Sequence, residues 1–193
     1  MADDPLALLS RSLDQLGRVI DGIDRERQAR LPTPCRSWDV GMLVGHVLNG
    51  LTKFALAAEG KRSDQPAEPR EVSGDWMESF RERSEALLDT WRKVGVTGTI
   101  MLPDLGEVPA AFPVFQQMTE LTVHAWDLAV ATGQSLDLDP EVTQDALEWA
   151  TGALRPEFRG DEDSGKGFGP AVDVPADASP TDRLVAWFGR QPA

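Results

Sequence analysis

The stretch from Pro113 to Gly133 constrains the fold of this chain more than any other part. Its apolar residues recur at intervals of three and four positions, which is the period of an amphipathic helix. Proline is favoured in the first turn of a helix and glycine just after the last turn, so both ends of the segment carry a boundary signal. The segment is therefore predicted to be one long helix with a single apolar face.

Two candidate metal ligands lie beside that apolar face. Glu120 and His124 are four positions apart, which places them on the same side of the helix, about 6 Å apart along its axis. A carboxylate and an imidazole arranged in this way can hold one metal ion between them. The alternative interpretation is a surface hydrogen bond, which is the more common role of such a pair.

Two observations favour the metal interpretation. His46 is the only other histidine, and it lies at the edge of the apolar stripe of a second predicted helix. In addition, the sequence from Val94 to Leu154 contains nine acidic residues and no lysine or arginine, a field that favours a cation. If His46 meets the pair, the ion has three protein ligands and keeps open positions, as in catalytic sites. A buried structural histidine is the alternative for His46.

Composition excludes several classes of function. The 193 residues suffice for one core or one core with a small appendage, and the net charge of −13 should repel nucleic acid. There is no basic amphipathic stripe for an anionic membrane, no apolar run near the ~20 residues of a membrane span, and no basic signal peptide. A single cysteine excludes an internal disulfide and fits a reducing compartment, so a cytoplasmic location is expected.

The periodicity along the chain predicts an all-α fold, a four-helix bundle with short extra helices. Residues 60–74 are polar and rich in proline, which predicts a long crossover, and residues 95–112 predict a small β-hairpin. One domain is expected over 1–193, with the bundle over about 4–154 and a docked C-terminal segment over 155–193. The two Glu-x-x-His motifs of a ferritin-like di-iron centre are absent from the sequence. The helices are expected at 4–29, from an N-cap at Ser37 to about 59, and at 75–94, 113–133, 140–154 and 181–189.

Three stretches resemble one known family. They are T-P-C-R-S-W-D-V-G-M-L-V-G-H-V at 33–47, E-L-T-V-H-A-W-D-L-A-V-A-T-G at 120–133 and D-R-L-V-A-W-F-G-R-Q-P at 182–192. Together they resemble the DinB-like superfamily, and within it the actinobacterial branch related to the mycothiol-dependent maleylpyruvate isomerase N-terminal domain. The resemblance implies a four-helix bundle with a crossover, in which His46, Glu120 and His124 match the metal ligands.

The resemblance also implies a chemistry. Relatives hold a divalent metal, usually zinc and in some cases nickel or iron, which binds a low-molecular-weight thiol such as mycothiol or bacillithiol. The thiolate then attacks an electrophile. The isomerase carries a separate C-terminal domain, whereas about 40 residues of loop and short helix follow the predicted bundle here.

Three functions are thus open at the level of sequence. The first is a metal-dependent thiol S-transferase or isomerase-like enzyme, with a small-molecule thiol and an electrophile as partners and a homodimer left open. The second is a non-catalytic metal-binding protein, and the third is a structural helical bundle. The roles of Cys35, Asn49 and Asp127 are also open: Asp127 can accept a hydrogen bond behind a metal ligand or face solvent, and Cys35 can be a redox thiol or a small buried side chain.

Overall fold

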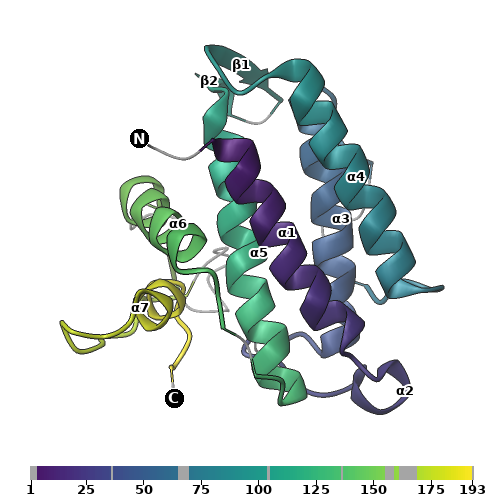
Figure 1. Cartoon of the computed structure of the whole chain (residues 1–193), viewed down its shortest axis with the longest axis vertical. Helices are drawn as coiled ribbons and strands as arrows, with labels where there is room; N and C mark the ends of the chain where they lie inside the picture. Colours follow the sequence, from purple (N-terminus) through teal and green to yellow (C-terminus); the bar gives the residue numbers. More distant parts are fainter. Residues whose placement is uncertain are drawn as a thin grey trace.

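Four long helices form the body of the protein (Figure 1). The computed structural model describes residues 4–35, 37–64, 70–103, 105–135, 137–154, 159–160 and 169–192. The long helices are α1 (Pro5–Asp21), α3 (Val40–Ala58), α4 (Trp76–Val94) and α5 (Ala111–Thr132). The shorter elements are α2 (Arg25–Gln28), β1 (Thr99–Leu102), β2 (Gly106–Pro109), α6 (Pro140–Ala153) and α7 (Pro180–Trp187).

The long helices close into a ring around one core. Helix α1 packs against α5, α5 against α3, α3 against α4, and α4 against α1. The predicted all-α bundle is therefore confirmed. Helices α1 and α3, which follow one another among the long helices, occupy opposite corners, so α3 and α5 become neighbours despite the distance between them in sequence. This pairing of α3 with α5 positions the candidate site.

The segment between α3 and α4 is the long crossover that the sequence predicts. Near its start, Arg62 Nη2 donates a hydrogen bond to the carbonyl oxygen of Pro103, beside the hairpin. Near its end, Arg25 in α2 donates to Glu71 Oε1 and to the carbonyl oxygen of Val72. The hairpin and α2 lie at opposite ends of the bundle (Figure 1). The crossover therefore begins at one end of the bundle and finishes at the other, so that α3 and α4 run parallel.

Two glycines of α3, Gly41 and Gly45, let the crossover pass close to the helix. A methyl group at Gly45 would overlap the carbonyl oxygen of Arg70, which is backbone and cannot rotate away. A side chain at Gly41 would press on Glu71, whose carboxylate accepts from Arg25 and Arg30. The missing side chains therefore let the chain pass directly over α3.

We expect Gly45→Ala to lower the free energy of unfolding by about 2–3 kcal/mol, the cost of overfilling a packed contact. Gly152 in α6 is the matched control, because nothing lies within 4 Å of a methyl group built there. Gly152→Ala should raise stability by about 0.5–1 kcal/mol through helix propensity alone. Urea unfolding of both variants tests the contact, and equal stability of the two would show that the crossover does not press on α3.

Aspartates begin most of the helices, by accepting hydrogen bonds from backbone N–H groups of the first turn. Asp39 caps α3 by accepting from the N–H of Met42 at 2.9 Å, so the prediction of Ser37 as the N-cap is wrong. The single helix predicted over 4–29 is also wrong. Helix α1 ends at Asp21 with Gly22 as its C-cap, and Asp24 starts the separate α2. A local N-cap thus outweighs the continuous apolar periodicity.

The hairpin and the last helix behave as the sequence indicates. Strands β1 and β2 pair antiparallel from Thr99 opposite Pro109 to Leu102 opposite Gly106. Gly133 ends α5 with φ of 70°, the left-handed conformation that favours glycine at a C-cap. Helix α6 packs on α5, and α7 packs on α6, where Trp187 Nε1 donates to the carbonyl oxygen of Ala150 at 3.1 Å. Within the C-terminal segment that the sequence predicts to dock on the bundle, Phe158 and Phe168 lie outside the described residues.

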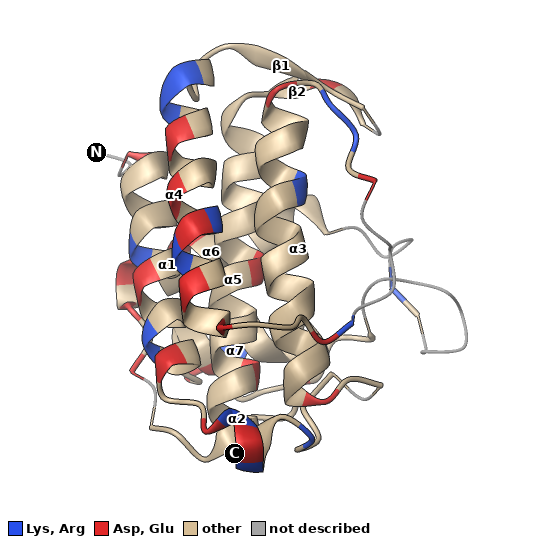
Figure 2. Ribbon diagram, turned by 90° about the vertical axis from the view of Figure 1, so that its right-hand side faces the viewer, with Lys and Arg blue, Asp and Glu red and all other residues tan. Residues whose placement is uncertain are grey.

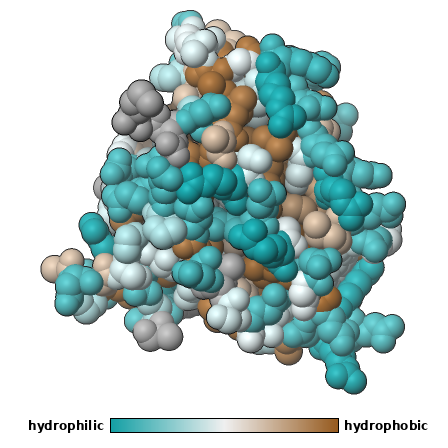
Figure 3. All heavy atoms as spheres, viewed as in Figure 1, coloured by the Kyte–Doolittle hydropathy of each residue, from teal (hydrophilic) through white to brown (hydrophobic). Residues whose placement is uncertain are grey.

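Helix α3 is long and apolar enough to cross a membrane if only its length and composition are considered. The core helix of a soluble protein passes the same test, and the buried side chains of α3, among them Leu43, Leu48 and Leu51, belong to the bundle core. The face of the protein seen in Figure 3 is mostly hydrophilic, with hydrophobic strips between the helices. The apolar character of α3 is therefore explained by its place in the core.

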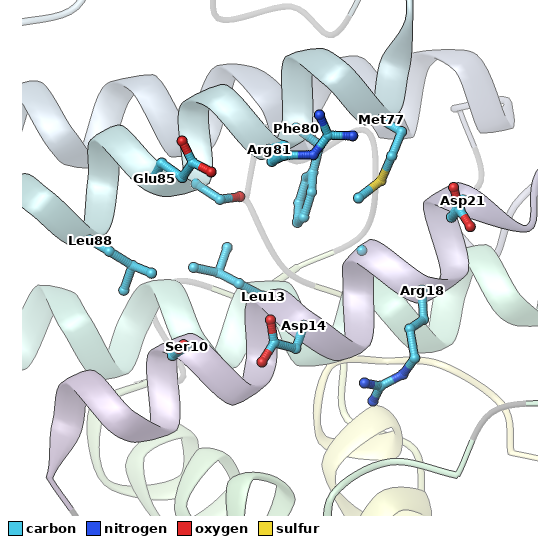
Figure 4. A pocket seen from close by; sticks show the side chains of 12 residues that line it. Ser10, Leu13, Asp14, Arg18, Asp21, Met77, Phe80, Arg81, Glu85 and Leu88 are labelled. Atoms are coloured by element: carbon cyan, nitrogen blue, oxygen red, sulfur yellow. The ribbon is translucent and has the colours of Figure 1, made fainter.

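An open groove of about 420 Å³ lies between α1 and α4 (Figure 4). Leu13 and Phe80 form its floor, while Asp14, Arg18 and Arg81 flank it. Its lining contains no histidine or cysteine, and its charged side chains are three acidic residues and two arginines. The groove therefore lacks an imidazole or a thiol, and the histidines and the cysteine of the chain lie elsewhere.

Candidate metal centre

The packing of α3 against α5 brings the two histidines of the chain together. The ring centroids of His46 and His124 are 5.1 Å apart, with the rings nearly perpendicular at 83°. Trp38, in the turn before α3, covers His46 from another side with a centroid distance of 4.7 Å. Glu120 lies one turn before His124 on α5. The three residues predicted from the sequence as metal ligands thus come from two adjacent helices and meet in one region.

A cavity of about 550 Å³ opens beside these residues, with His46 and Glu120 in its wall. This volume is in the range of small-molecule sites. The cavity lies between α3, α5, the tip of the hairpin and the start of the crossover. Asn49, which the sequence left open, also lines it. Its other lining residues are Gly50, Lys53, Phe54, Ala57, Arg62, Ser63, Leu102, Pro103, Leu105, Pro113 and Gln116.

Asp127 fixes His124 from the side away from Glu120. Its carboxylate Oδ2 is 3.0 Å from His124 Nδ1, and its side chain is 0% exposed. Of the two roles that the sequence left open for Asp127, the structure places it as the buried hydrogen-bond acceptor. Because Nδ1 is engaged with Asp127, Nε2 is the nitrogen of His124 that remains for a ligand.

Arg190, from the segment after α7, holds Asp127 in turn. Its Nε donates to Oδ1 at 3.0 Å and its Nη2 to Oδ2 at 2.7 Å, a two-point pairing of guanidinium with carboxylate. Nη1 donates to the carbonyl oxygen of Phe188, which fixes the arginine against its own helix end. Through Arg190, the C-terminal segment therefore reaches the buried carboxylate of Asp127.

Cys35 completes this cluster. Thr33 shapes the turn by donating from Oγ1 to the carbonyl oxygens of Trp38 and Cys35. The turn places Cys35 Sγ 3.4 Å from Asp127 Oδ2 and 3.1 Å from Arg190 Nη2. Cys35 is thus half-buried and engaged with charged groups, which neither of the two sequence interpretations describes. Within the described residues, ligand atoms of Cys35, His124 and Asp127 lie within 4.8 Å of one another, close enough for a metal ion.

Burial and neighbouring charges set the protonation of the metal-free site. Burial, together with the charges of His124, Lys53 and Arg190, lowers the pKa of His46 to about 3, so His46 is neutral. Burial also opposes the charge on His124, but the hydrogen bonds with Asp127 and Cys35 outweigh it and raise its pKa to about 9. Burial raises the pKa of the Glu120 carboxyl. Without a metal, the proton of the histidine pair is therefore on His124.

The pKa of Asp127 is likewise set by burial on one side and hydrogen bonds on the other. Burial would raise its pKa, yet the hydrogen bonds from His124 and Arg190 outweigh burial and lower the pKa to about 2. Asp127 is consequently a carboxylate at all ordinary pH values. Asp127 therefore links Arg190 and His124 by direct hydrogen bonds to both.

Two functional candidates were missed by the sequence analysis. Arg190 is 63 positions from Asp127, and its signal was its place in the stretch 182–192. Lys53 lines the cavity, and its signal was that it is the only charged residue of α3. The absence of cations from Val94 to Leu154 is thus a property of the sequence only, because Arg190 and Lys53 bring positive charge to this region of the fold.

The fold and these side chains define a helical-bundle protein with a histidine–carboxylate cluster between α3 and α5. The chain belongs to the mycothiol maleylpyruvate isomerase N-terminal domain family, which matches residues 9–129. Two uncharacterized proteins of Mycobacterium tuberculosis, from two strains, are each 33% identical to it over 188 residues, which is 97% of this chain and 98% of theirs.

Two solved structures share the fold. One is a crystal structure of the mycothiol-dependent maleylpyruvate isomerase, with a TM-score of 0.54 and 17% identity. The other is a mutant of that isomerase, with a TM-score of 0.61 and 14% identity. Each match covers 85% of this chain and 72% of the isomerase. At this level of identity the likeness establishes the DinB-like architecture.

Proposed function

We propose that this protein is a divalent-metal-dependent enzyme that joins a low-molecular-weight thiol of the mycothiol type to an electrophilic small molecule, by S-transfer or within an isomerisation. The observation that carries the proposal is the meeting of His46 and His124 from separate helices, beside Glu120, at the wall of a cavity of about 550 Å³. Membership of a family described by mycothiol supports the choice of thiol.

The donor set fits a divalent ion. His46 is neutral, the form of imidazole that binds a metal, and His124 offers Nε2 because Nδ1 contacts Asp127. Glu120 supplies a carboxylate at the cavity wall. Two imidazoles and one carboxylate suit zinc, with nickel and iron as alternatives, and leave positions for exogenous ligands. Asp127 then has the role of the carboxylate that orients a metal-bound histidine.

The rival donor set is Cys35, His124 and Asp127, whose ligand atoms lie closer together than those of the proposed set. The guanidinium of Arg190 argues against it. Arg190 Nη2 is 2.7 Å from Asp127 Oδ2 and 3.1 Å from Cys35 Sγ, so a cation there would have to displace a buried arginine. We therefore favour the side of His124 that faces His46.

When bound, a divalent ion would lower the pKa of a coordinated thiol, so that its sulfur reacts as a thiolate at neutral pH. The residues of this chain divide the remaining tasks. His46, Glu120 and His124 hold the ion, Asp127 and Arg190 orient His124, and the cavity holds the electrophile beside them. In a transfer, the sulfur–carbon bond forms as the leaving group departs with its electron pair, and the thiol proton passes to solvent.

The test begins with protein stripped by chelator and titrated with Zn²⁺ and Co²⁺. We expect one ion per chain. Addition of mycothiol to the Co²⁺ form should produce a near-ultraviolet charge-transfer band from thiolate to metal. Conjugation is then followed with mycothiol and monobromobimane, whose bromide is displaced by the sulfur. Release of the fluorescent product faster than without protein would support the enzyme.

The outcomes separate the three hypotheses. Metal without a thiol signal and without conjugation would support a metal-binding protein that lacks catalysis. Failure to bind one ion would favour the structural bundle, in which the cluster of Arg190, Asp127, Cys35 and His124 is a polar core in its own right. A cytoplasmic location is part of the proposal, since a free thiol cosubstrate needs a reducing compartment.

A further inference from the structure

One wall of the cavity beside the candidate centre is a single face of α3, and this face carries a lysine. His46, Asn49 and Lys53 line the cavity at intervals that return to the same side of a helix. Lys53 lies two turns beyond His46, about 10 Å along the helix axis. Because helical side chains lean toward the N-terminus, the stem of Lys53 is directed back toward His46.

The charge of Lys53 is unusual for its surroundings. The protein has a net charge of −13, and Lys53 is the only charged residue of α3, a helix drawn mostly in the tan of uncharged residues in Figure 2. Its side chain is exposed, and no carboxylate among the described residues forms an ion pair with it. The lysine is therefore available to a negatively charged group inside the cavity.

A second cation lies at the rim of the same cavity. Arg62 follows α3 in the crossover, and its Nη2 donates to the carbonyl oxygen of Pro103 at 2.9 Å, which holds it beside the hairpin. Among the described lining residues, Glu120 is the only acidic one, and the proposed function assigns its charge to the metal. The other charged side chains of the described lining, Lys53 and Arg62, are both basic.

We propose that Lys53 anchors a carboxylate of the small molecule that enters this cavity, with Arg62 as the second charge at the rim, so that the electrophile is a small organic anion. Phe54, Leu102 and Leu105 supply the apolar wall for its carbon skeleton. The reactive carbon would lie toward His46 and the carboxylate toward Lys53. The inference rests on the proposed function for the reaction, whereas the anion site itself requires no thiol.

Iodoacetate and iodoacetamide test the inference during catalysis. Both are attacked at the same kind of carbon with loss of iodide, but only iodoacetate carries a carboxylate. Lys53→Met should lower kcat/KM for iodoacetate about 10- to 100-fold, mainly through KM, because a charged hydrogen-bond partner is lost. The same variant should change kcat/KM for iodoacetamide less than about 2-fold. The S-alkylated mycothiol is quantified by chromatography, so that alkylation of Cys35 is not counted.

Lys61→Met is the matched control. Lys61 is a neighbouring lysine outside the cavity lining, and it pairs with Glu59 on the surface at 2.7 Å. The Lys61→Met variant removes the same charge from the protein but should leave the ratio of kcat/KM for iodoacetate to kcat/KM for iodoacetamide unchanged. An equal loss of iodoacetate activity in both lysine variants would show a general charge effect and overturn the anchor.

Binding of succinate to the metal-free protein tests the anion site without any reaction. Backbone amide signals of α3 around Lys53 should shift saturably with succinate in wild type and in Lys61→Met, and should not shift in Lys53→Met. If wild type accelerates neither iodo reagent, the proposed function fails while succinate still decides the inference. Absence of succinate shifts in wild type, or equal shifts in Lys53→Met, would overturn the anion site.

Discussion

Replacement of His124 by alanine is expected to abolish stoichiometric binding of Zn²⁺. Wild-type protein should bind one ion, whereas two remaining protein ligands, His46 and Glu120, should hold the ion at least about 100-fold more weakly. The ligand that the variant removes is the imidazole that Asp127 contacts at 3.0 Å. Competition with a chromophoric chelator measures the affinity, and elemental analysis of the dialysed protein measures the stoichiometry.

Three further variants identify the ligand set. Glu120→Gln should weaken Zn²⁺ about as strongly as His124→Ala, since an amide is a poor ligand. Cys35→Ser should retain binding, because Cys35 belongs to the rival set with Asp127. Asn49→Ala is the control, since it lies in the cavity wall but offers no ligand. Loss of metal in Cys35→Ser with retention in Glu120→Gln would assign the ion to the rival set instead.

Sequence periodicity was sufficient for the body of the fold. The apolar spacing in 113–133 predicts α5 within two residues at its start and one at its end. The same spacing fails at 4–29, where the apolar face continues across Gly22 but the N-cap at Asp24 restarts the chain as α2. Periodicity reports which residues are buried, and it does not report where the backbone turns.

The candidate site was predictable in part for the same reason. Glu120 and His124 share a helix, so their spacing alone places them together, and His46 was singled out because histidine is rare in this chain. Arg190 and Lys53 could not be placed. The contact of Arg190 with Asp127 depends on how α7 docks on α6, which no local pattern encodes. The importance of Lys53 depends on a cavity formed by several segments.

The second large effect is expected when Arg190, which the docking of α7 brings to Asp127, is substituted. Arg190→Met should weaken Zn²⁺ binding about 10-fold and Asp127→Asn about 10- to 100-fold, because the orientation and basicity of His124 depend on this chain of hydrogen bonds. Arg190→Met should also cost about 3–5 kcal/mol of stability, since it leaves the fully buried carboxylate of Asp127 without its guanidinium. Arg190→Lys should recover part of both losses, because a lysine restores the charge but not the two-point pairing.

Arg183→Met is the matched control, because Arg183 is an exposed arginine of α7, the helix that precedes Arg190. It should leave both the affinity and the thermal midpoint unchanged. Affinity is measured at a temperature where each variant is folded, so that stability and metal binding are read separately. A fall in Tm for Arg190→Met with unchanged Zn²⁺ affinity would make Arg190 a structural clamp only. A parallel fall of affinity in Arg190→Met and Asp127→Asn would make the C-terminal segment part of the metal centre, because Arg190 then acts on the metal through Asp127 and His124.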